Sequence, residues 1–428
     1  MRILMFGWEF PPHITGGLGT ACYGLVKGLI KHNADVMFVV PRAYGDESGE
    51  GFRLLNASDV VVDITRTEHQ EYWNKLKYME IGSNLIPYVG EEEFLNEIQK
   101  DYVRKESQTQ GVFSERFTFS GKYGVNLMEE VSRYALVASV IARSYDYDVI
   151  HAHDWLTYAA GIAAKQISGK PLVVHVHATE FDRSGENVNQ NVFEMEQKGM
   201  EYADLVITVS NLTRQIVIER YGISADKVIT VHNAVEPVEH HDREEVSKHL
   251  KEKVVTFLGR VTFQKGPDYF IEAAHKVLQR DPNVRFVMAG SGDLLNKMIR
   301  RVAQLHMATN FHFTGFLAGQ EVDKMFALSD VYVMPSVSEP FGISPLEAMR
   351  SNVPVVISKQ SGVAEVLKHA LKVDFWDIDA LADAIYGLLH YEGLKKMFFK
   401  YGKDEVDNLK WDNAAKKVLE VYTKAVNL

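Results

Sequence analysis

The stretch that decides the fold is Ser338-Glu339-Pro340-Phe341-Gly342-Ile343-Ser344-Pro345-Leu346-Glu347-Ala348-Met349. It carries two carboxylates, one before a glycine turn and one inside a helical pattern. Ser344, Pro345 and Glu347 have the residue types of N-cap, N1 and N3, so we expect a capping box that starts a helix. The free N–H groups at a helix start favour an anion. The stretch therefore predicts a site for a diphosphate, with a glutamate on either side to hold hydroxyl groups.

Around this stretch, short apolar runs alternate with helical patterns along the chain, which predicts an α/β protein with parallel strands. The expected strands are Arg2–Phe6, Val36–Val40, Val149–His151, Leu172–His175, Leu205–Val209, Val228–Val231, Val254–Leu258, Val284–Ala289, Phe311–Thr314, Val331–Met334 and Val355–Ile357. A polar stretch without periodicity, from 236 to 245, divides them into two sets. We expect two doubly wound domains, 1–236 and 245–410.

Two further motifs accompany the first. Gly259-Arg260 is followed by Lys265-Gly266 after an expected strand, and His151-Ala152-His153-Asp154-Trp155 ends another. Together the three motifs resemble those of retaining nucleotide-sugar glycosyltransferases with the two-domain GT-B fold. Within these they are similar to the GT4 group and to glycogen and starch synthases. The resemblance extends over nearly the whole chain, least well between about 45 and 125.

The resemblance implies an architecture of two Rossmann-like domains that face a central cleft. The first domain would hold the acceptor, and the second would hold the nucleotide-sugar donor. The last helix of such enzymes crosses back onto the first domain, and we expect the same of 411–428. An aromatic-rich insertion at about 84–123 is too long for a simple connection. An acceptor-binding role and a surface excursion with its own small core are equally open for it.

The resemblance also assigns catalytic roles. Arg260 and Lys265 would stabilise the negative charge that develops on the leaving diphosphate. His153 would hydrogen-bond the 6-hydroxyl of the donor sugar, and Glu339 would hold its 3- and 4-hydroxyls. Glu347 would hold the ribose. No metal ion and no cofactor are expected, because protein cations neutralise the phosphates.

Other residues are expected to line the donor site. Besides Glu347, these are Gly16, Gly17, Gly290, Phe316, Leu317, Phe341, Gly342 and Ile343. Gly16 and Gly17 belong to a motif similar to the Lys-Thr-Gly-Gly-Leu of glycogen synthases, but Ile14 stands where those enzymes carry lysine. This difference argues against an ADP-glucose starch synthase of the usual bacterial type. Arg183 is expected to face the cleft and to bind acceptor or phosphate.

Each of these residues also has a purely structural interpretation. Glu347 could serve only the capping box with Ser344. Arg260 and Lys265 could be ordinary surface charges between a strand and a helix. The histidines could be satisfied residues of a core or cleft. The joint occurrence of the motifs in one order favours the functional interpretation.

Composition sets the remaining limits. The net charge of −10 argues against nucleic acid as a partner. The single cysteine, Cys22, excludes an internal disulfide and a cysteine-based zinc cluster. The N-terminus lacks a signal-peptide pattern, and no apolar run is long enough to span a bilayer. We therefore expect a cytoplasmic enzyme without an integral membrane segment.

The sequence predicts a retaining glycosyltransferase that moves glucose from UDP- or ADP-glucose to an α-glucan such as glycogen. The alternative is the same chemistry on a small sugar, a sugar phosphate or a lipid-linked glycan. An epimerase on the same fold would lack the pair Glu339 and Glu347, and a non-enzymatic nucleotide-sugar binder would not need His153. The choice between UDP and ADP stays open.

Overall fold

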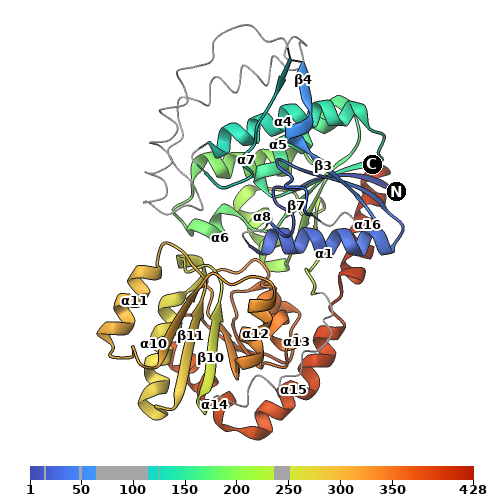
Figure 1. Ribbon diagram of the computed structural model, residues 1–428. Helices are drawn as coiled ribbons and strands as arrows, with labels where there is room; N and C mark the ends of the chain where they lie inside the picture. The colour runs from blue at the N-terminus through green and yellow to red at the C-terminus, as the bar shows by residue number, and fades with distance from the viewer. Residues whose placement is uncertain (14–15, 48–50, 64–113, 125, 236–250) are drawn as a thin grey trace, which may run out of the picture.

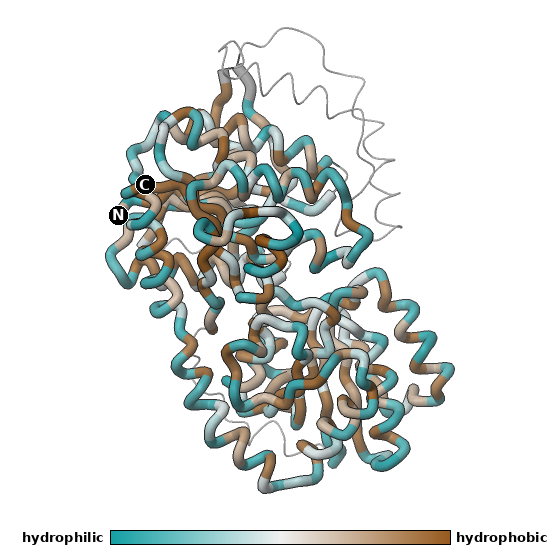
Figure 2. The backbone as a smooth tube through the Cα atoms, turned by 180° about the vertical axis from the view of Figure 1, so that it is seen from behind, coloured by the Kyte–Doolittle hydropathy of each residue, from teal (hydrophilic) through white to brown (hydrophobic). Residues whose placement is uncertain are grey.

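Two separate parallel sheets form the centres of the molecule. The computed structural model describes residues 1–13, 16–47, 51–63, 114–124, 126–235 and 251–428. In Figure 1 the sheet of the first half of the chain lies above that of the second half, and helices surround both. Figure 2 shows that the strands are mostly hydrophobic, whereas polar residues follow the outer helices. The prediction of a GT-B-like pair of Rossmann-like sheets is confirmed.

The first sheet has seven parallel strands. Their spatial order is β3 (Arg53–Asn56), β2 (Asp35–Val40), β1 (Arg2–Phe6), β6 (Val149–His153), β7 (Leu172–Val176), β8 (Leu205–Thr208) and β9 (Val228–Thr230). The accompanying helices are α1 (Gly17–Lys31), α4 (Leu127–Ser144), α5 (Trp155–Ser168), α6 (Glu180–Ser184), α7 (Gln190–Tyr202), α8 (Asn211–Tyr221) and the 3-10 turn η1 (Ala57–Asp59). A separate antiparallel pair joins β4 (Val61–Asp63) to β5 (Ser114–Arg116).

The second sheet has six parallel strands. Their order is β12 (Phe311–Gly315), β11 (Val284–Ala289), β10 (Lys253–Leu258), β13 (Val331–Met334), β14 (Val355–Ser358) and β15 (Leu371–Val373). Its helices are α10 (Pro267–Arg280), α11 (Leu295–Gln304), α12 (Gln320–Leu328), α13 (Ser344–Arg350), α14 (Ile378–His390), α15 (Glu392–Asp407) and the 3-10 turns η2 (Phe263–Lys265) and η3 (Gly362–Glu365).

The last helix, α16 (Trp411–Val426), leaves the second domain and packs beside α1 of the first (Figure 1). Two glycines of α1 allow this close approach. A Cβ at Gly24 would lie 2.2 Å from the Trp411 ring, and one at Gly28 would lie 2.6 Å from the Trp411 carbonyl oxygen. Trp411 and Tyr422 thereby enter the apolar core on one face of the first sheet. The chain is thus tied to the first domain at both of its ends.

The sequence predicted buried strands better than exposed or very short ones. Arg2–Phe6, Val284–Ala289 and Val331–Met334 have their predicted bounds. The prediction missed β3 and β15, which are mostly half-buried or exposed, and β4 and β5, which have three residues each. Most of the predicted insertion, residues 84–113, and the predicted break at 236–245 lie outside the described residues. Of the remaining insertion, Phe117 and Phe119 are buried in the first-domain core.

Strand order fixes where ligands can bind. The order reverses between β1 and β6 in the first sheet, and between β10 and β13 in the second. Loops that leave neighbouring strands in opposite directions open a crevice at such a switch point, at the carboxyl ends of the strands. Three of the sequence motifs follow β6, β10 and β13, so topology alone places them at these crevices.

Candidate active site

The loop after β10 carries both predicted phosphate-binding cations. Arg260 follows the strand directly, and its Nη2 lies 3.4 Å from Gln264 Oε1. Lys265 ends η2, and Gly266 then takes a left-handed conformation with φ 65° before Pro267 opens α10. A Cβ at Gly266 would lie only 2.1 Å from the Pro335 carbonyl oxygen, so this backbone approach requires glycine. The turn therefore holds the cations against the end of β13, the strand that leads to Glu339.

The loop after β13 holds Glu339. The backbone of Glu339 donates to the Gln360 carbonyl at 3.0 Å and accepts from the Gly362 amide at 2.9 Å. Its carboxylate accepts a hydrogen bond from Ser336 Oγ at 3.2 Å. Gly342 adopts φ 97° and passes close to the Glu339 side chain. Glu339 is thus held by backbone on one side and by a glycine turn on the other.

The two loops meet in an ion pair. Lys265 Nζ lies 2.5 Å from Glu339 Oε2, with the side chains 21% and 8% exposed. These residues were predicted to serve different parts of the donor, the diphosphate and the sugar. They neutralise each other in a mostly buried position, where an unpaired charge would be costly.

The predicted capping box at Ser344 is wrong. Ser344 is the first residue of α13 and Ile343 is its N-cap, without a side-chain cap bond. The Ser344 hydroxyl instead lies 2.7 Å from the hydroxyl of Tyr332, a buried residue of β13. Glu347 is half-buried, and burial raises its pKa above the usual 4.5, against the opposing effect of Arg350. The capping explanation for Glu347 therefore fails.

The loops that were predicted to line the nucleoside pocket touch one another through their backbones. A Cβ at Gly290 would lie 1.8 Å from the Gly259 carbonyl oxygen, so the loops after β10 and β11 touch through their main chains. Beyond β12, Phe316 is 59% exposed while Leu317 packs on the core beneath it. An exposed aromatic ring at the carboxyl end of a strand offers a flat apolar surface to a base.

The glycine turn of the first motif lies between the two domains. Phe341 is buried, whereas Gly342 and Ile343 are half-buried. Ile343 packs against apolar clusters of both domains. The turn that was predicted to border the diphosphate is therefore fixed from both sides of the cleft.

In the first domain, His153 ends β6 and its ring is fully buried. Its Nδ1 lies 2.9 Å from His177 Nε2. The hydrogen bond between this ring and the donor sugar stays a prediction, and in the described arrangement the ring does not reach solvent. Gly16 caps the start of α1, and a Cβ at Gly16 or Gly17 would meet nothing within 4 Å. The start of α1 therefore has open space beside it.

Arg183 was predicted to face the cleft, but its side chain is buried in ion pairs. Its side chain is 5% exposed, with Nε 2.9 Å from Glu180 Oε2 and Nη2 in contact with Glu196. Glu196 also accepts a hydrogen bond from Tyr221. Both buried carboxylates pair with the guanidinium, because burying a carboxylate without a partner costs free energy. The two ion pairs hold the guanidinium, and the role of Arg183 in binding acceptor or phosphate stays a prediction.

Sequence reasoning missed the residues that join the domains around the site. Asp182 of α6 accepts a hydrogen bond from Ser338 at 2.6 Å. Glu365 of η3 accepts from the Asn211 and Leu212 amides at 2.9 and 2.7 Å, at the start of α8. Thr179 and Asp182 form a capping box that the sequence could have revealed. The partners of Glu365 lie more than 130 residues away, so no local pattern marks it.

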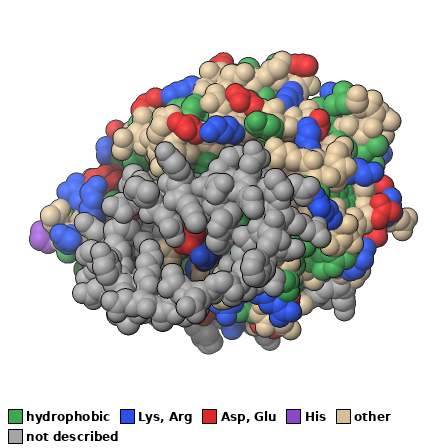
Figure 3. All heavy atoms as spheres, turned by 90° about the horizontal axis from the view of Figure 1, so that it is seen from above, with side chains coloured by type: hydrophobic (Ala, Val, Ile, Leu, Met, Phe, Trp, Pro, Cys, Tyr) green, Lys and Arg blue, Asp and Glu red, His purple; other side chains and the backbone are tan. Residues whose placement is uncertain are grey.

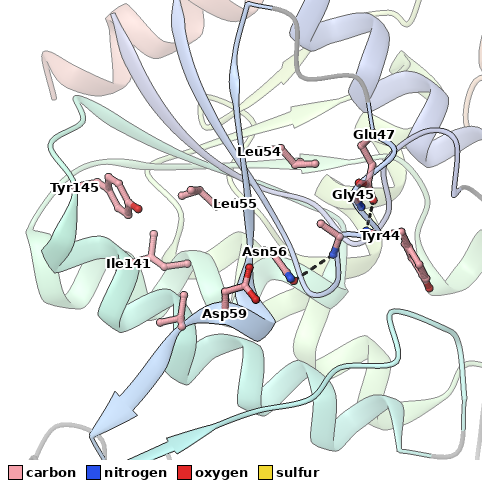
Figure 4. A pocket seen from close by; sticks show the side chains of 11 residues that line it. Tyr44, Gly45, Glu47, Leu54, Leu55, Asn56, Asp59, Ile141 and Tyr145 are labelled. Carbon is pink, nitrogen blue, oxygen red and sulfur yellow. Dashed lines mark hydrogen bonds between the residues drawn. The ribbon is translucent and has the colours of Figure 1, made fainter.

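A separate pocket of about 610 Å³ lies beside the edge strand β3 (Figure 4). Tyr44 and Tyr145 stand at opposite ends of the view, with Asn56 and Asp59 between them. Its remaining lining residues are Ala43, Gly45, Glu47, Leu54, Leu55, Val60 and Ile141. The predicted site residues do not line it, so it is distinct from the site at the domain boundary.

The outer surface gives no sign of a single-sign binding face in the view of Figure 3. Basic and acidic side chains are interspersed there around the residues that are drawn in grey. Among the described residues, no helix combines the length and apolarity that crossing a bilayer demands.

Comparison with known proteins agrees with this geometry. Residues 2–231 match the starch synthase catalytic domain, and residues 238–405 match the glycosyl transferases group 1. The chain is 30% identical to an uncharacterised glycosyltransferase of Methanocaldococcus jannaschii, over 100% of this chain and 99% of that protein. It is 29% identical to an alpha-maltose-1-phosphate synthase of Mycolicibacterium smegmatis (64% and 79% covered) and 23% identical to a glycogen synthase of Mycobacterium tuberculosis (99% and 95% covered).

The fold comparison covers the whole chain as well. A sucrose-phosphate synthase from Thermosynechococcus elongatus superposes with a TM-score of 0.72 at 18% identity, over 99% of this chain and 98% of that one. This likeness supports the two-domain fold. The family models match both halves of the chain, and Lys265 and Glu339 pair where the strand order of the second sheet reverses. The chain therefore belongs to the GT-B glycosyltransferases that resemble glycogen and starch synthases.

Proposed function

We propose that the protein is a retaining hexosyltransferase that moves glucose from UDP- or ADP-glucose to an α-glucan. The observation that carries the proposal is the ion pair of Lys265 and Glu339 beside Arg260, at the switch point of the second sheet. A cation and a carboxylate at this point suit the two halves of a nucleotide sugar. The cation meets the diphosphate, and the carboxylate meets the sugar hydroxyls.

The reaction follows from where charge develops. When the bond between the anomeric carbon and the diphosphate oxygen breaks, negative charge grows on the leaving group. Arg260 and Lys265 stabilise that charge, which lowers the barrier in a partly buried site. Glu339 holds the sugar's 3- and 4-hydroxyls, and Glu347 holds the ribose. Exposed Phe316 and neighbouring Leu317 receive the base.

Retention needs no protein nucleophile in this scheme. The acceptor hydroxyl attacks the face that the diphosphate leaves, and the leaving phosphate oxygen takes the hydroxyl proton. The new glycosidic bond then forms with the original anomeric configuration. The protein's own part is to hold donor and acceptor in place and to stabilise charge, without a metal ion on the diphosphate.

The acceptor has two candidates. Likeness to a glycogen synthase over nearly the full length supports an α-glucan. Likeness to an alpha-maltose-1-phosphate synthase supports a sugar phosphate equally well. A small sugar and a lipid-linked glycan belong to the same second class of acceptors.

A panel of donors and acceptors tests both classes of acceptor. Labelled UDP-glucose and ADP-glucose are each incubated with glycogen, with glucose 1-phosphate and with a lipid-linked glycan, and the labelled product is separated by size. Label on the outer chains of glycogen supports the proposal. Label only on the small or lipid-linked acceptors moves the assignment to the second class. Diphosphate release without any transfer, or no reaction with either donor, contradicts it.

A further inference from the structure

The pocket beside β3 is lined by three consecutive residues of that strand, Leu54, Leu55 and Asn56 (Figure 4). Successive side chains of a strand point to opposite faces of its sheet, so the pocket follows the edge of the strand rather than one face. In the described part of the chain, β3 pairs with β2 alone. The outer side of such an edge presents main-chain N–H and C=O groups that the sheet does not use. The edge therefore adds backbone hydrogen-bonding groups to those of the side chains.

Two polar side chains of the pocket keep hydrogen-bonding capacity. Asn56 Oδ1 accepts from the amides of Ala43 and Ser58, both at 3.2 Å, and its Nδ2 has no partner among the described residues. Asp59 ends η1 and is exposed, and its carboxylate makes no hydrogen bond or ion pair with the residues that the structure describes. Figure 4 shows the two side chains next to each other. A donor and an acceptor side by side suit a ligand with hydroxyl groups, which both donate and accept.

The charge of the lining residues indicates the class of ligand. Glu47 and Asp59 are carboxylates, and none of the described residues that line the pocket is a lysine or an arginine. Glu47 accepts from the amides of Tyr44 and Gly45 at 2.7 and 2.8 Å, which fixes its carboxylate at the pocket. Both carboxylates would repel a phosphate group, and the lining offers no cation to offset the repulsion. The pocket therefore favours a neutral ligand over a sugar phosphate or a nucleotide.

The apolar part of the pocket suits the carbon-bound hydrogens of a sugar ring. Tyr145 is 38% exposed, and its ring makes no aromatic or cation contact with the described residues. The ring of Tyr44 is already in use, because it lies 4.0 Å from the His13 ring and 4.8 Å from the Arg42 guanidinium. Tyr145 is therefore the aromatic residue of the pocket that can stack on a ligand. The aliphatic lining residues are Leu54, Leu55, Val60 and Ile141.

We propose that this pocket binds a short run of neutral, α-linked glucose units, at a site separate from the donor cleft. Its volume of about 610 Å³ is typical of small-molecule sites, which span roughly 300–1,000 Å³. The ring of Tyr145 stacks on one glucose unit, and Asn56 Nδ2 and the Asp59 carboxylate hydrogen-bond its hydroxyls. This assignment rests on the proposed function, since an α-glucan acceptor supplies such a chain.

A second polypeptide strand fits this edge less well than a glucan. β3 has only four residues, and its first residue, Arg53, is exposed. Asp59 follows shortly after the strand and is exposed as well. Short edge strands with charged residues resist pairing with another strand. The hydroxyl-rich, neutral chain therefore remains the occupant that the lining residues favour.

The pocket lies on the first domain, next to the loop that leads to α1. The ring of Tyr44 packs against His13, which shortly precedes Gly16, the N-cap of α1. A glucan that is held at a second site keeps its chain ends at a higher local concentration around the protein. A sugar phosphate is too short to occupy both sites. The pocket should therefore act on polymeric acceptors alone, which separates the two classes of acceptor.

The test measures binding of maltoheptaose to the full-length protein by calorimetry, without a donor. Tyr145→Ala and Asp59→Ala should each weaken this binding by about tenfold, through loss of stacking and of a charged hydrogen-bond acceptor. Tyr145→Phe should keep most of the affinity, because the ring remains. Glucose 1-phosphate should bind equally to the wild type and to Tyr145→Ala. In transfer assays, Tyr145→Ala should raise the KM for glycogen and leave kcat and the donor KM unchanged.

The matched control is Tyr202→Ala. Tyr202 of α7 is a 54% exposed tyrosine of the same domain that does not line the pocket, so its loss should leave maltoheptaose binding unchanged. Circular dichroism identifies variants that fail to fold. The proposal is overturned if the wild type does not bind maltoheptaose, or if folded Tyr145→Ala and Asp59→Ala bind it as the wild type does. It is also overturned if Tyr202→Ala weakens binding as much, or if glucose 1-phosphate binding depends on Tyr145.

Failure of the pocket and failure of the proposed function give different results. Transfer of glucose to glycogen with the same glycogen KM in Tyr145→Ala and wild type would overturn the pocket and leave the glucosyltransferase in place. Maltoheptaose binding that depends on Tyr145, in a protein that transfers no glucose to a glucan, would support the pocket and contradict the proposed function.

Discussion

Asp182 Oδ1 accepts a hydrogen bond from Ser338 Oγ at 2.6 Å, across the boundary between the two domains. Asp182 is 1% exposed, and its other oxygen accepts from the amide and hydroxyl of Thr179 at 2.7 and 2.8 Å. Ser338 directly precedes Glu339. The loop that carries Glu339 is therefore anchored to the first domain by a buried carboxylate.

Ser338→Ala should lower kcat about tenfold with a small change in KM, because it removes the hydrogen-bond donor that fixes the Glu339 loop. It also leaves the buried Asp182 carboxylate with one partner fewer, which should lower the free energy of unfolding by about 1–3 kcal/mol. Steady-state kinetics with varied donor measure this split. Ser224→Ala removes an exposed serine that pairs only with nearby Asp226, and should leave both constants unchanged. Equal kinetics in the Ser338 variant and the wild type would contradict an anchoring role.

Arg260→Ala and Lys265→Ala should each weaken binding of UDP or ADP by roughly 1.5–3 kcal/mol, since each removes a charge-assisted contact to phosphate. The structure adds a difference between them. Lys265→Ala leaves the Glu339 carboxylate, which is 8% exposed, without its ion-pair partner, so it should also reduce the stability of the fold. Adding Glu339→Gln to this variant should restore part of that loss, because it removes the unpaired charge. Calorimetry and thermal unfolding measure the two effects. Unchanged affinity for both nucleotides in both variants would end the assignment.

The two glutamates should differ in their kinetic effects. Glu339→Gln should cut kcat on the order of 10²-fold, because it holds the sugar as the anomeric carbon gains charge. Glu347→Gln should mainly raise the donor KM, because the ribose does not change during the reaction. Ser344 makes no capping box, so the Glu347 variant should show no loss of helix capping in thermal unfolding. Equal kcat losses in both variants would show that this division is wrong.

Glu365 should make the domain contact sensitive to acid. Burial opposes its ionisation, but hydrogen bonds from His232 and from the Asn211 and Leu212 amides outweigh burial and lower its pKa below the usual 4.5. A carboxyl with a lowered folded-state pKa contributes stability above its unfolded pKa, and that stability is lost as the pH falls through the folded value. Glu365→Gln should therefore be less stable than the wild type at pH 7, and the gap should narrow below about pH 4.5.

Urea unfolding of Glu365→Gln and wild type between pH 3 and pH 8 measures that gap. Glu186→Gln is a matched control, because Glu186 pairs with Arg220 on the surface and is 83% exposed. Such an exposed pair contributes little to stability. A gap that stays constant from pH 8 to pH 3 would contradict the role given to the Glu365 carboxylate.

Turnover should not depend on Mg²⁺ or Mn²⁺, because Arg260 and Lys265 supply the positive charge at the diphosphate. Initial rates after brief treatment with EDTA, with and without each added ion, measure this. Loss of turnover that either ion restores would contradict the expectation.

The sequence by itself determined the two parallel sheets and the order of the motifs along the chain. Apolar runs such as Val36–Val40 are decisive because burial on both faces of a parallel sheet leaves few alternatives. The residue types of Arg260, Lys265, Glu339 and Glu347, at their spacing, also led to the proposed chemistry. These features depend on near neighbours in the chain, so a local pattern contains them.

Only the tertiary structure decided which groups pair. Arg183 was predicted for the cleft, yet Glu180 and Glu196 bury it in ion pairs. Ser344 was predicted to cap α13, yet the Tyr332 hydroxyl takes its side chain. The contacts of Asp182 with Ser338, and of Lys265 with Glu339, join residues 156 and 74 positions apart. The packing of separate helices and strands brings such partners together. Burying a charge without a partner costs free energy, so the folded structure pairs each buried charge. No short stretch of sequence contains this information, because the partners are far apart in the chain.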